Sequence, residues 1–468
     1  MTIKNPRASR RSFLRNSLLA LGGTAGLSAA GGVGPMSRLA NGAWYRPDGA
    51  PQRYYIFCYF GGGWDVLLGL DPRDPRDFHS GNLADTLIQP GYDLLDDEGH
   101  IADIVNTSSG LQFGPYIGDL ASHSEKLAVV RGMSMETLTH EAGRRRFLTG
   151  KVPSGLLARG SSGATWLASR LGMGQLVPQI SVNVESYNVD QPEFASALKV
   201  SSVPDLVRSL EPAGAALGEL EERQIDEMLI QAALCPNPQA SKMWRGSEEA
   251  RAGVSAMIEA ELASQFNFQA NSAEMEALRD HYGIAATGAA ALTTPEAQAA
   301  MATTALKKGI SRVVSMRPTS QSLDTHYDNW TTDQGPIQER GFNAIARMIE
   351  DLETTEFEDS GSSWMDHTTI VAFSEFSRTP RLNANTGRDH SLMNAALLLG
   401  GGIKGGQAIG KSSNIGMEPT TTDLLTGQWS PEGEIVKPEH ILRTLMVEAG
   451  VSDDEADLRV EPIRALLK

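Results

Sequence analysis

The chain has 468 residues, of which 41% are hydrophobic and 21% charged, a composition typical of a globular protein with a sizeable core. Its formal net charge is −16 at pH 7, and no lysine and arginine block follows the first segment, so nucleic-acid binding through a basic patch is not expected. The two cysteines, Cys58 and Cys235, are too few for a metal-binding knuckle or a disulfide framework.

The N-terminal stretch "SRRSFLRNSLLALGGTAGLSAAGG" has paired arginines, Arg10 and Arg11, followed by a modest apolar run. This order predicts a twin-arginine signal peptide and linker over residues 1–43, with cleavage between about residues 29 and 43. The alternative is a basic, disordered arm. A signal implies the twin-arginine (Tat) export machinery as a partner and a periplasmic or secreted protein. Glycines interrupt the apolar run, so no stable membrane span is expected after processing.

The remaining chain, residues 50–468, is expected to form one α/β domain. The stretch "YYIFCYF" predicts a buried strand over 54–60, which ends in three glycines followed by Asp65. A second strand is expected near 127–130, with a helix over about 141–148. Residues 205–305 are rich in alanine and glutamate and show the apolar spacing of amphipathic helices, so they predict a helical insertion. Within it, Thr294 is the expected N-cap of a helix that begins at Pro295.

Strands and helices alternate again after residue 309. Strands are expected over 310–317, 368–376 and from 393, with a helix from about 336 between the first two. Such alternation is typical of a central, mostly parallel sheet sandwiched by helices. In these sheets, functional sites lie at the carboxyl ends of the strands.

Five acidic or imidazole side chains follow or precede the predicted strands, and one edge of the sheet could bring them together. Converging carboxylates and imidazoles require a cation between them, so we expect a divalent ion there, with zinc, manganese, calcium and magnesium all open. Taken singly, each residue has a simpler interpretation: a turn at Asp324, an ion pair of Glu375 with Arg378, or an Asp389 that orients His390. The expected ligands are Asp65, Asp324, His326, Glu375 and His390.

Five segments, in this order, resemble the DUF1501 family of exported proteins. They are "GGGWD", "THEAGRRRFLTG", "SLDTHYD", "VAFSEFSRTPRLNANTGRDHS" and "LLLGGGIKGG". The family itself looks like a distant branch of the alkaline phosphatase and sulfatase superfamily, and its activity is largely uncharacterised. The resemblance therefore implies an alkaline phosphatase-like sheet with a metal site at one edge.

The superfamily pattern can be carried over to individual positions. Asp65 resembles the first metal-binding aspartate, and Asp324 with His326 the later Asp/His pair, with Asp328 as a substitute. Glu375 stands for a strand-end aspartate and His390 for the last metal histidine. One departure is Phe376, which stands where a ligand histidine is usual.

A second departure concerns the nucleophile. The resemblance places His140 where the sulfatases carry their nucleophilic cysteine or serine. Three roles stay open for His140: the missing metal ligand, a nucleophile or general base, or no catalytic role. Thr137 and Thr139 are alternative nucleophiles, although a hydroxyl needs a base or a metal to activate it. Arg144 lines up with the sulfatase arginine, and either it or Arg378 is expected to hold an anionic substrate.

Two functions follow as expectations. The first is an extracytoplasmic, metal-dependent hydrolase of phosphate or sulfate esters, with a small-molecule or polymeric anionic substrate. The second is an exported, non-catalytic metal-binding or scaffold protein with a degenerate hydrolase fold, which the lack of a hydroxyl or thiol at position 140 favours.

Overall fold

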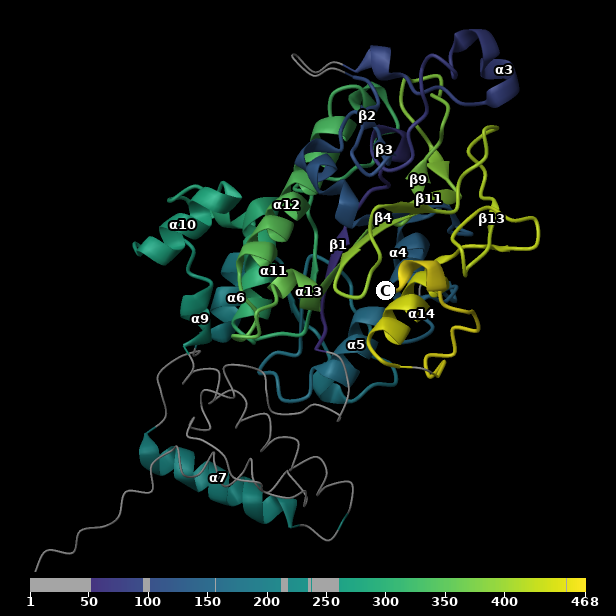
Figure 1. Ribbon diagram of the computed structural model, residues 1–468. Coiled ribbons are helices and arrows are strands. Elements are labelled where there is room, and N and C mark those ends of the chain that lie inside the picture. The colour runs from purple at the N-terminus through teal and green to yellow at the C-terminus, as the bar shows by residue number, and fades with distance from the viewer. Residues whose placement is uncertain are drawn as a thin grey trace, which may run out of the picture.

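The structure is a computed structural model that describes residues 52–95, 102–155, 157–211, 218–234, 237, 261–451 and 453–468 (Figure 1). The predicted signal peptide and linker, residues 1–43, lies outside the described residues. A search of the described helices finds none with both the length and the apolar character needed to cross a membrane.

An eight-stranded sheet forms the centre of the fold. Its strand order is β12-β4-β11-β8-β1-β7-β5-β6, and only β11 runs antiparallel to its neighbours within this sheet. The mostly parallel sheet that the sequence predicts is therefore confirmed. The strands are β1 (Tyr54–Tyr59), β4 (Leu127–Ser134), β5 (Gln179–Val182), β6 (Leu198–Val200), β7 (Val313–Met316), β8 (Thr368–Phe373), β11 (Met393–Gly400) and β12 (Gln407–Ile409).

Strand β1 shows why the sheet needs helices on both faces. All six of its residues are buried, and alternate side chains enter two different cores. Ile56 and Cys58 belong to one core, whereas Tyr55 and Phe57 belong to the other. A strand whose two faces are both covered is apolar throughout, which is why the sequence reads as a continuous apolar run rather than an alternating one.

Helices cover the two faces of the sheet (Figure 1). On one face lie α4 (His140–Thr149), α5 (Gly163–Leu171) and α14 (Pro438–Glu448). On the other lie α6 (Val203–Leu210), α10 (Ala273–Tyr282), α11 (Pro295–Lys307) and α12 (Gln334–Thr354). The remaining described α-helices are α3 (Leu83–Thr86), α7 (Glu219–Ala233), α9 (Leu262–Gln265) and α13 (Trp364–His367).

Part of the predicted helical insertion contributes to the covering layer of the sheet. Leu206 of α6 and Met301 of α11 are buried in the same core as Ile56 of the central strand. Thr294 caps α11 as expected, because its side chain accepts a hydrogen bond from the backbone N–H of Ala297. Residues 212–217, 235–236 and 238–260 of the predicted insertion lie outside the described residues.

The loops that carry functional side chains leave the sheet at one edge. Strands β1, β4, β5, β7 and β8 point the same way, so their carboxyl ends meet there. The antiparallel β11 begins at this edge, which brings the segment before it to the same place. Three short pairs complete the strands: β2 (Val105–Asn106) with β3 (Gln112–Phe113), β9 (Ser377–Arg378) with β10 (His390–Ser391), and β13 (Thr421–Thr422) with β14 (Glu434–Ile435).

Candidate metal centre

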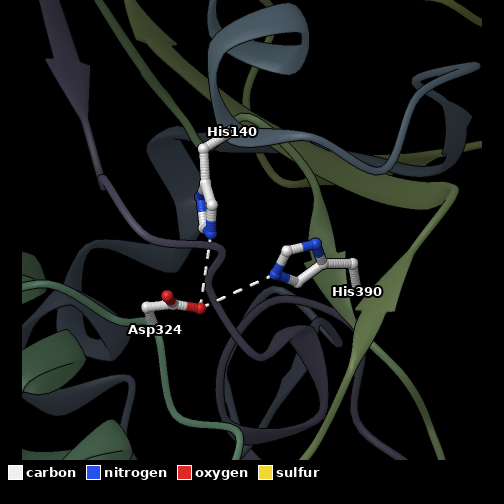
Figure 2. A group of neighbouring side chains, drawn as sticks. All are labelled: His140, Asp324 and His390. Atoms are coloured by element: carbon white, nitrogen blue, oxygen red, sulfur yellow. Dashed lines mark ion pairs between the residues drawn. The ribbon is translucent and has the colours of Figure 1, made fainter.

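One oxygen of Asp324 is the centre of a cluster of imidazole groups. Asp324 Oδ1 lies 3.3 Å from His140 Nε2 and 3.6 Å from His390 Nε2, as the dashed lines of Figure 2 show. It also lies 3.1 Å from His326 Nε2. The four residues come from the start of α4, the loop after β7, and β10. Sequence positions 140, 324, 326 and 390 are thus brought to one point by the sheet.

Each of the three imidazoles is held through its other nitrogen, Nδ1. Two of the acceptors are carboxylates and one is a backbone carbonyl, so in each case Nδ1 is the protonated nitrogen when the carboxylates are ionised. Nε2 of each neutral ring then carries a lone pair directed at Asp324. The three contacts are His140 Nδ1 to Glu375 Oε1 at 2.7 Å, His326 Nδ1 to Asp389 Oδ1 at 3.0 Å, and His390 Nδ1 to Leu138 O at 2.6 Å.

Two of these lone pairs face each other. His326 Nε2 and His390 Nε2 are 2.9 Å apart, a distance at which two lone pairs repel unless a proton or a cation lies between them. Arg378 supplies part of the positive charge, since its Nη1 is 3.3 Å from His326 Nε2 and its Nη2 is 2.6 Å from Asp324 Oδ1. The cluster therefore combines imidazole and carboxylate groups that a shared proton or a cation would stabilise.

The surroundings set the protonation of the cluster. Burial raises the pKa of Asp324, but the hydrogen bond and charge of Arg378 outweigh burial, and the net pKa lies below its usual value. Burial lowers the pKa of His140, yet the hydrogen bond and charge of Glu375 raise it to a net value above the usual one. Burial, with the charges of Arg378 and the neighbouring imidazoles, lowers the pKa of His390. Asp324 is thus an anion at neutral pH.

Glu375 reaches the site from the end of β8 but supports His140 instead of facing Asp324. Its buried carboxylate accepts hydrogen bonds from the backbone N–H of Gly62 at 2.8 Å and from Ser374 Oγ at 3.0 Å. Burial raises the pKa of Glu375, and the hydrogen bonds from His140 and the backbone lower it to a net value below the usual one. Gly62 has φ +110°, so this turn of the glycine run requires a residue without Cβ.

The loop between β9 and β10 holds His326 in place. Asn383 Nδ2 donates to His326 O at 3.0 Å and to Asp389 Oδ1 at 3.1 Å. A Cβ on Gly387 would lie 2.1 Å from the carbonyl carbon of His326, so the two loops touch through their backbones. Phe376 packs against the rings of His140 and His390, with centroids 4.8 and 4.2 Å away. Phe376, which stands where the resemblance implies a ligand histidine, thus forms an apolar wall of the cluster.

Asp65 is not brought into the cluster, and our expectation that it joins the other ligands needs correction. Its buried carboxylate lies 2.9 Å from Arg388 Nε and accepts hydrogen bonds from Trp330 Nε1 at 2.9 Å and the N–H of Leu67 at 3.0 Å. Both oxygens are therefore engaged in a buried ion pair and a turn. Asp328, the suggested substitute, is exposed at the start of a 3₁₀ turn (Asp328–Trp330) whose last residue, Trp330, is buried.

Arg378 also has a different role from the one expected. Its side chain is fully buried and donates to the carbonyl oxygens of Gly62, Gly63 and Arg388 as well as to Asp324. A guanidinium held in this way positions the Asp324 carboxylate and has no free edge for a substrate anion.

A cleft of about 750 Å³ opens beside the cluster, and its lining includes His140, Asp324 and Glu375. Arg144, expected to hold an anionic substrate, lines this cleft, and its Nη2 is paired with Glu185 Oε1 at 2.6 Å. Thr139 is the exposed N-cap residue of α4, next to His140.

Comparison with known proteins places the chain in a family. Residues 55–426 match the family described as "Protein of unknown function (DUF1501)". The chain belongs to the DUF1501 family. No curated protein matches the sequence. The solved structure "Crystal structure of Ps i-CgsB in complex with k-i-k-neocarrahexaose" is similar to this DUF1501 protein with a TM-score of 0.38 and 9% sequence identity, over 89% of this chain and 75% of that chain.

Two basic residues of the DUF1501 protein's cleft were missed by the sequence reasoning. Arg317 follows β7, and Lys199 lies in β6 at the edge of the sheet. Strands β5 and β6 have only four and three residues, too few for a clear apolar pattern, so nothing in the sequence placed Lys199 near the cluster. The position of Arg317 at a predicted strand end was the available signal.

Proposed function

We propose that this DUF1501 protein is an extracytoplasmic, metal-dependent hydrolase of phosphate or sulfate esters, with an alkaline phosphatase-like fold. The observation that carries the proposal is the convergence of three imidazole Nε2 atoms on Asp324 Oδ1, with every Nδ1 already anchored. Histidines held through one nitrogen by a carboxylate or carbonyl, with the other nitrogen free to bind, are the usual arrangement around protein-bound metals.

The donor set fits a transition-metal ion better than calcium or magnesium. Calcium and magnesium prefer oxygen ligands, whereas imidazole suits zinc and its neighbours in the first transition row. His140, Asp324, His326 and His390 would hold the ion, with Glu375 and Asp389 as the supports of two imidazoles. A bound ion would supply positive charge that stabilises the negative charge developing on the ester oxygens during hydrolysis.

The residues of the chain have separate tasks in this proposal. Glu375 fixes the tautomer and orientation of His140, which we assign as a ligand. Arg378 holds the Asp324 carboxylate and keeps it ionised. Thr139 is not assigned as the nucleophile because, among the described residues, its hydroxyl has no basic partner that would activate it.

Metal analysis and ester hydrolysis test the proposal together. We expect the purified protein to carry a first-row transition metal, and to hydrolyse members of a panel of aryl phosphate and aryl sulfate esters. Treatment with a chelator should abolish turnover and lower the melting temperature, and adding the metal back should restore both. A protein that binds no divalent ion and is neither inactivated nor destabilised by chelation would contradict it.

A second candidate function is non-catalytic metal binding by a degenerate hydrolase fold. It is favoured by the ion pair of Arg378 with Asp324, which already places a cation beside the carboxylate, and by the histidine at position 140. The variant His140→Ala separates the two functions. Loss of measured esterase activity with some metal retained supports the hydrolase, whereas a wild-type protein that binds metal but turns over no ester in the panel supports the scaffold.

Export by the twin-arginine route is part of the proposal. It rests on Arg10 and Arg11 and on the apolar run after them. Replacing both arginines by lysine should keep the protein inside the cytoplasm, as cell fractionation would show. Unchanged export of the double variant would contradict this route.

A further inference from the structure

We propose that Arg317 and Lys199 form a second anion-binding subsite in the cleft, so that the substrate carries an anionic group in addition to the ester that is hydrolysed. This inference rests on the proposed function for the scissile ester, which would lie at the cluster around Asp324. The subsite itself depends only on the shape and charge of the cleft.

The volume of the cleft indicates a substrate larger than a simple oxyanion. At about 750 Å³ it lies within the range of roughly 300–1,000 Å³ typical of sites for whole small molecules. Its lining extends from His140 and Asp324 at the cluster to Lys199 and Val200 of the edge strand β6. A molecule that fills it therefore meets groups of the cluster and groups of the edge strand.

The positive charges of the cleft differ in how they are compensated. Arg144 and Arg145 both lie by Glu185, with N–O distances of 2.6 and 3.8 Å, so the two guanidinium groups share one carboxylate, which neutralises one of their two charges. Arg317 and Lys199 also line the cleft, but neither forms an ion pair with a carboxylate of the described residues. Arg317 and Lys199 are thus the lysine and arginine side chains of the cleft lining that have no carboxylate partner among the described residues.

Arg317 is preorganised for this task by neutral acceptors. Its Nε donates to Thr319 Oγ1 at 3.3 Å and its Nη2 to Gln321 O at 3.1 Å, so part of the guanidinium is fixed without losing its charge. A Cβ on Gly61 would lie 3.3 Å from the central carbon of this guanidinium, which shows how closely the side chain packs on the glycine run. A fixed, half-buried guanidinium binds phosphate or sulfate oxygens with little loss of conformational entropy.

Binding of alkyl phosphates, measured by calorimetry, tests the subsite. The probes are propyl phosphate and a series of alkane bisphosphates of increasing chain length, applied to chelator-treated and metal-loaded protein. Arg317→Gln should weaken propyl phosphate binding to the chelated protein about tenfold, the loss expected for one charge-assisted contact. In the loaded protein, a bisphosphate of suitable length should bind about tenfold more tightly than propyl phosphate, and Arg317→Gln or Lys199→Gln should remove that advantage.

A matched control separates the local contact from a general change in charge. Lys404 is exposed, forms no ion pair with a described carboxylate and does not line the cleft, so Lys404→Gln removes the same charge and should leave binding unchanged. Lys199 is exposed on an edge strand, so Lys199→Gln is expected to fold. If Arg317→Gln and Lys199→Gln both bind the probes like wild type, the subsite is refuted. Binding of propyl phosphate to the chelated protein requires neither metal nor turnover. Failure of the proposed hydrolase function would therefore appear in the ester hydrolysis assay and not in this binding measurement.

Discussion

At the scale of single residues, the site depends on which nitrogen of each histidine is occupied. Asp389 accepts from Nδ1 of His326, and this hydrogen bond, the largest influence, lowers the pKa of Asp389. The Nε2 atom of His326 is thereby left to face Asp324 and His390. By accepting from Nδ1, the Asp389 carboxylate thus sets the tautomer of His326 and leaves its Nε2 unprotonated in the neutral ring.

Replacing Asp389 by asparagine should weaken metal binding. The amide can turn its NH₂ toward His326 Nδ1 and stabilise the other tautomer, so metal affinity should fall about tenfold or more, as is typical for the loss of such a support. Competition with a fluorescent zinc chelator measures the dissociation constant. Asp77 is exposed and far from this contact in sequence, so Asp77→Asn serves as the control. An unchanged affinity of Asp389→Asn would show that His326 does not bind the ion.

Asp65 should behave as a structural residue. Asp65→Asn leaves the Arg388 guanidinium buried without its counter-charge, which should lower the free energy of unfolding by about 3–5 kcal/mol. Urea denaturation measures this loss, and elemental analysis should find the metal content per folded chain unchanged. If Asp65→Asn instead loses its metal and keeps the wild-type free energy of unfolding, Asp65 is a metal ligand.

At the scale of elements, close backbone contacts fix the distance between helix α4 and strand β8. A Cβ on Gly143 would lie 2.4 Å from the carbonyl oxygen of Glu375, so α4 can approach the end of β8 only because residue 143 is glycine. This approach places His140 at hydrogen-bond distance from Glu375. The packing of α4 against the end of β8 therefore sets the position of His140 in the site.

Gly143→Ala should therefore destabilise the protein in spite of alanine's higher helix propensity. Propensity favours alanine by about 1 kcal/mol, whereas displacing a tightly packed backbone costs about 1–3 kcal/mol, and His140 moves with the helix. Thermal unfolding and metal affinity should both decrease. Gly160→Ala is the control, because its nearest neighbour is the movable side chain of Lys151. A variant more stable than wild type, with full metal affinity, would contradict the role of this contact.

Part of the site could be predicted from the sequence because strand ends are visible in it. Apolar runs located β1, β7 and β8, and the residues after the last two, Asp324, His326 and Glu375, do meet at one edge. The pairing of Asp65 with Arg388 could not be predicted, because it joins two loops far apart in the chain and neither has a periodic pattern. For the same reason, the sequence could not show that Glu375 supports His140 whereas His390 faces Asp324.

At the scale of the whole molecule, an ion pair joins the helices on one face of the sheet and links stability to pH. Asp351 of α12 bonds Lys307 of α11 and accepts from the Tyr282 hydroxyl at 2.7 Å. Burial raises the pKa of Asp351, but Lys307 and these hydrogen bonds lower it to a net value below the ordinary 3.8. A carboxyl whose pKa is lower in the folded state stabilises the protein above its unfolded pKa, and this stabilisation is lost as pH falls through the folded pKa.

Asp351→Asn should remove this contribution. At pH 7 the variant should be less stable than wild type by about 1–3 kcal/mol, the range for hydrogen bonds to charged groups. Below about pH 4 the difference should shrink, because the Asp351 carboxyl of the unfolded wild-type chain becomes protonated there, whereas that of the folded protein does so only at lower pH. Denaturant titrations from pH 3 to pH 7 measure both curves. A difference that stays constant over this range would show that the charge of Asp351 makes no contribution.

The most direct test of the metal centre is a crystal structure of the protein grown with zinc, with diffraction recorded on both sides of the zinc absorption edge. We predict one anomalous peak between Asp324 Oδ1 and the Nε2 atoms of His140 and His390, the group drawn in Figure 2, with His326 Nε2 as the fourth ligand. An Asp324→Asn crystal should lack this peak. No peak at this position in the wild-type crystal, with His326 and His390 instead sharing a proton at hydrogen-bond distance, would contradict the account.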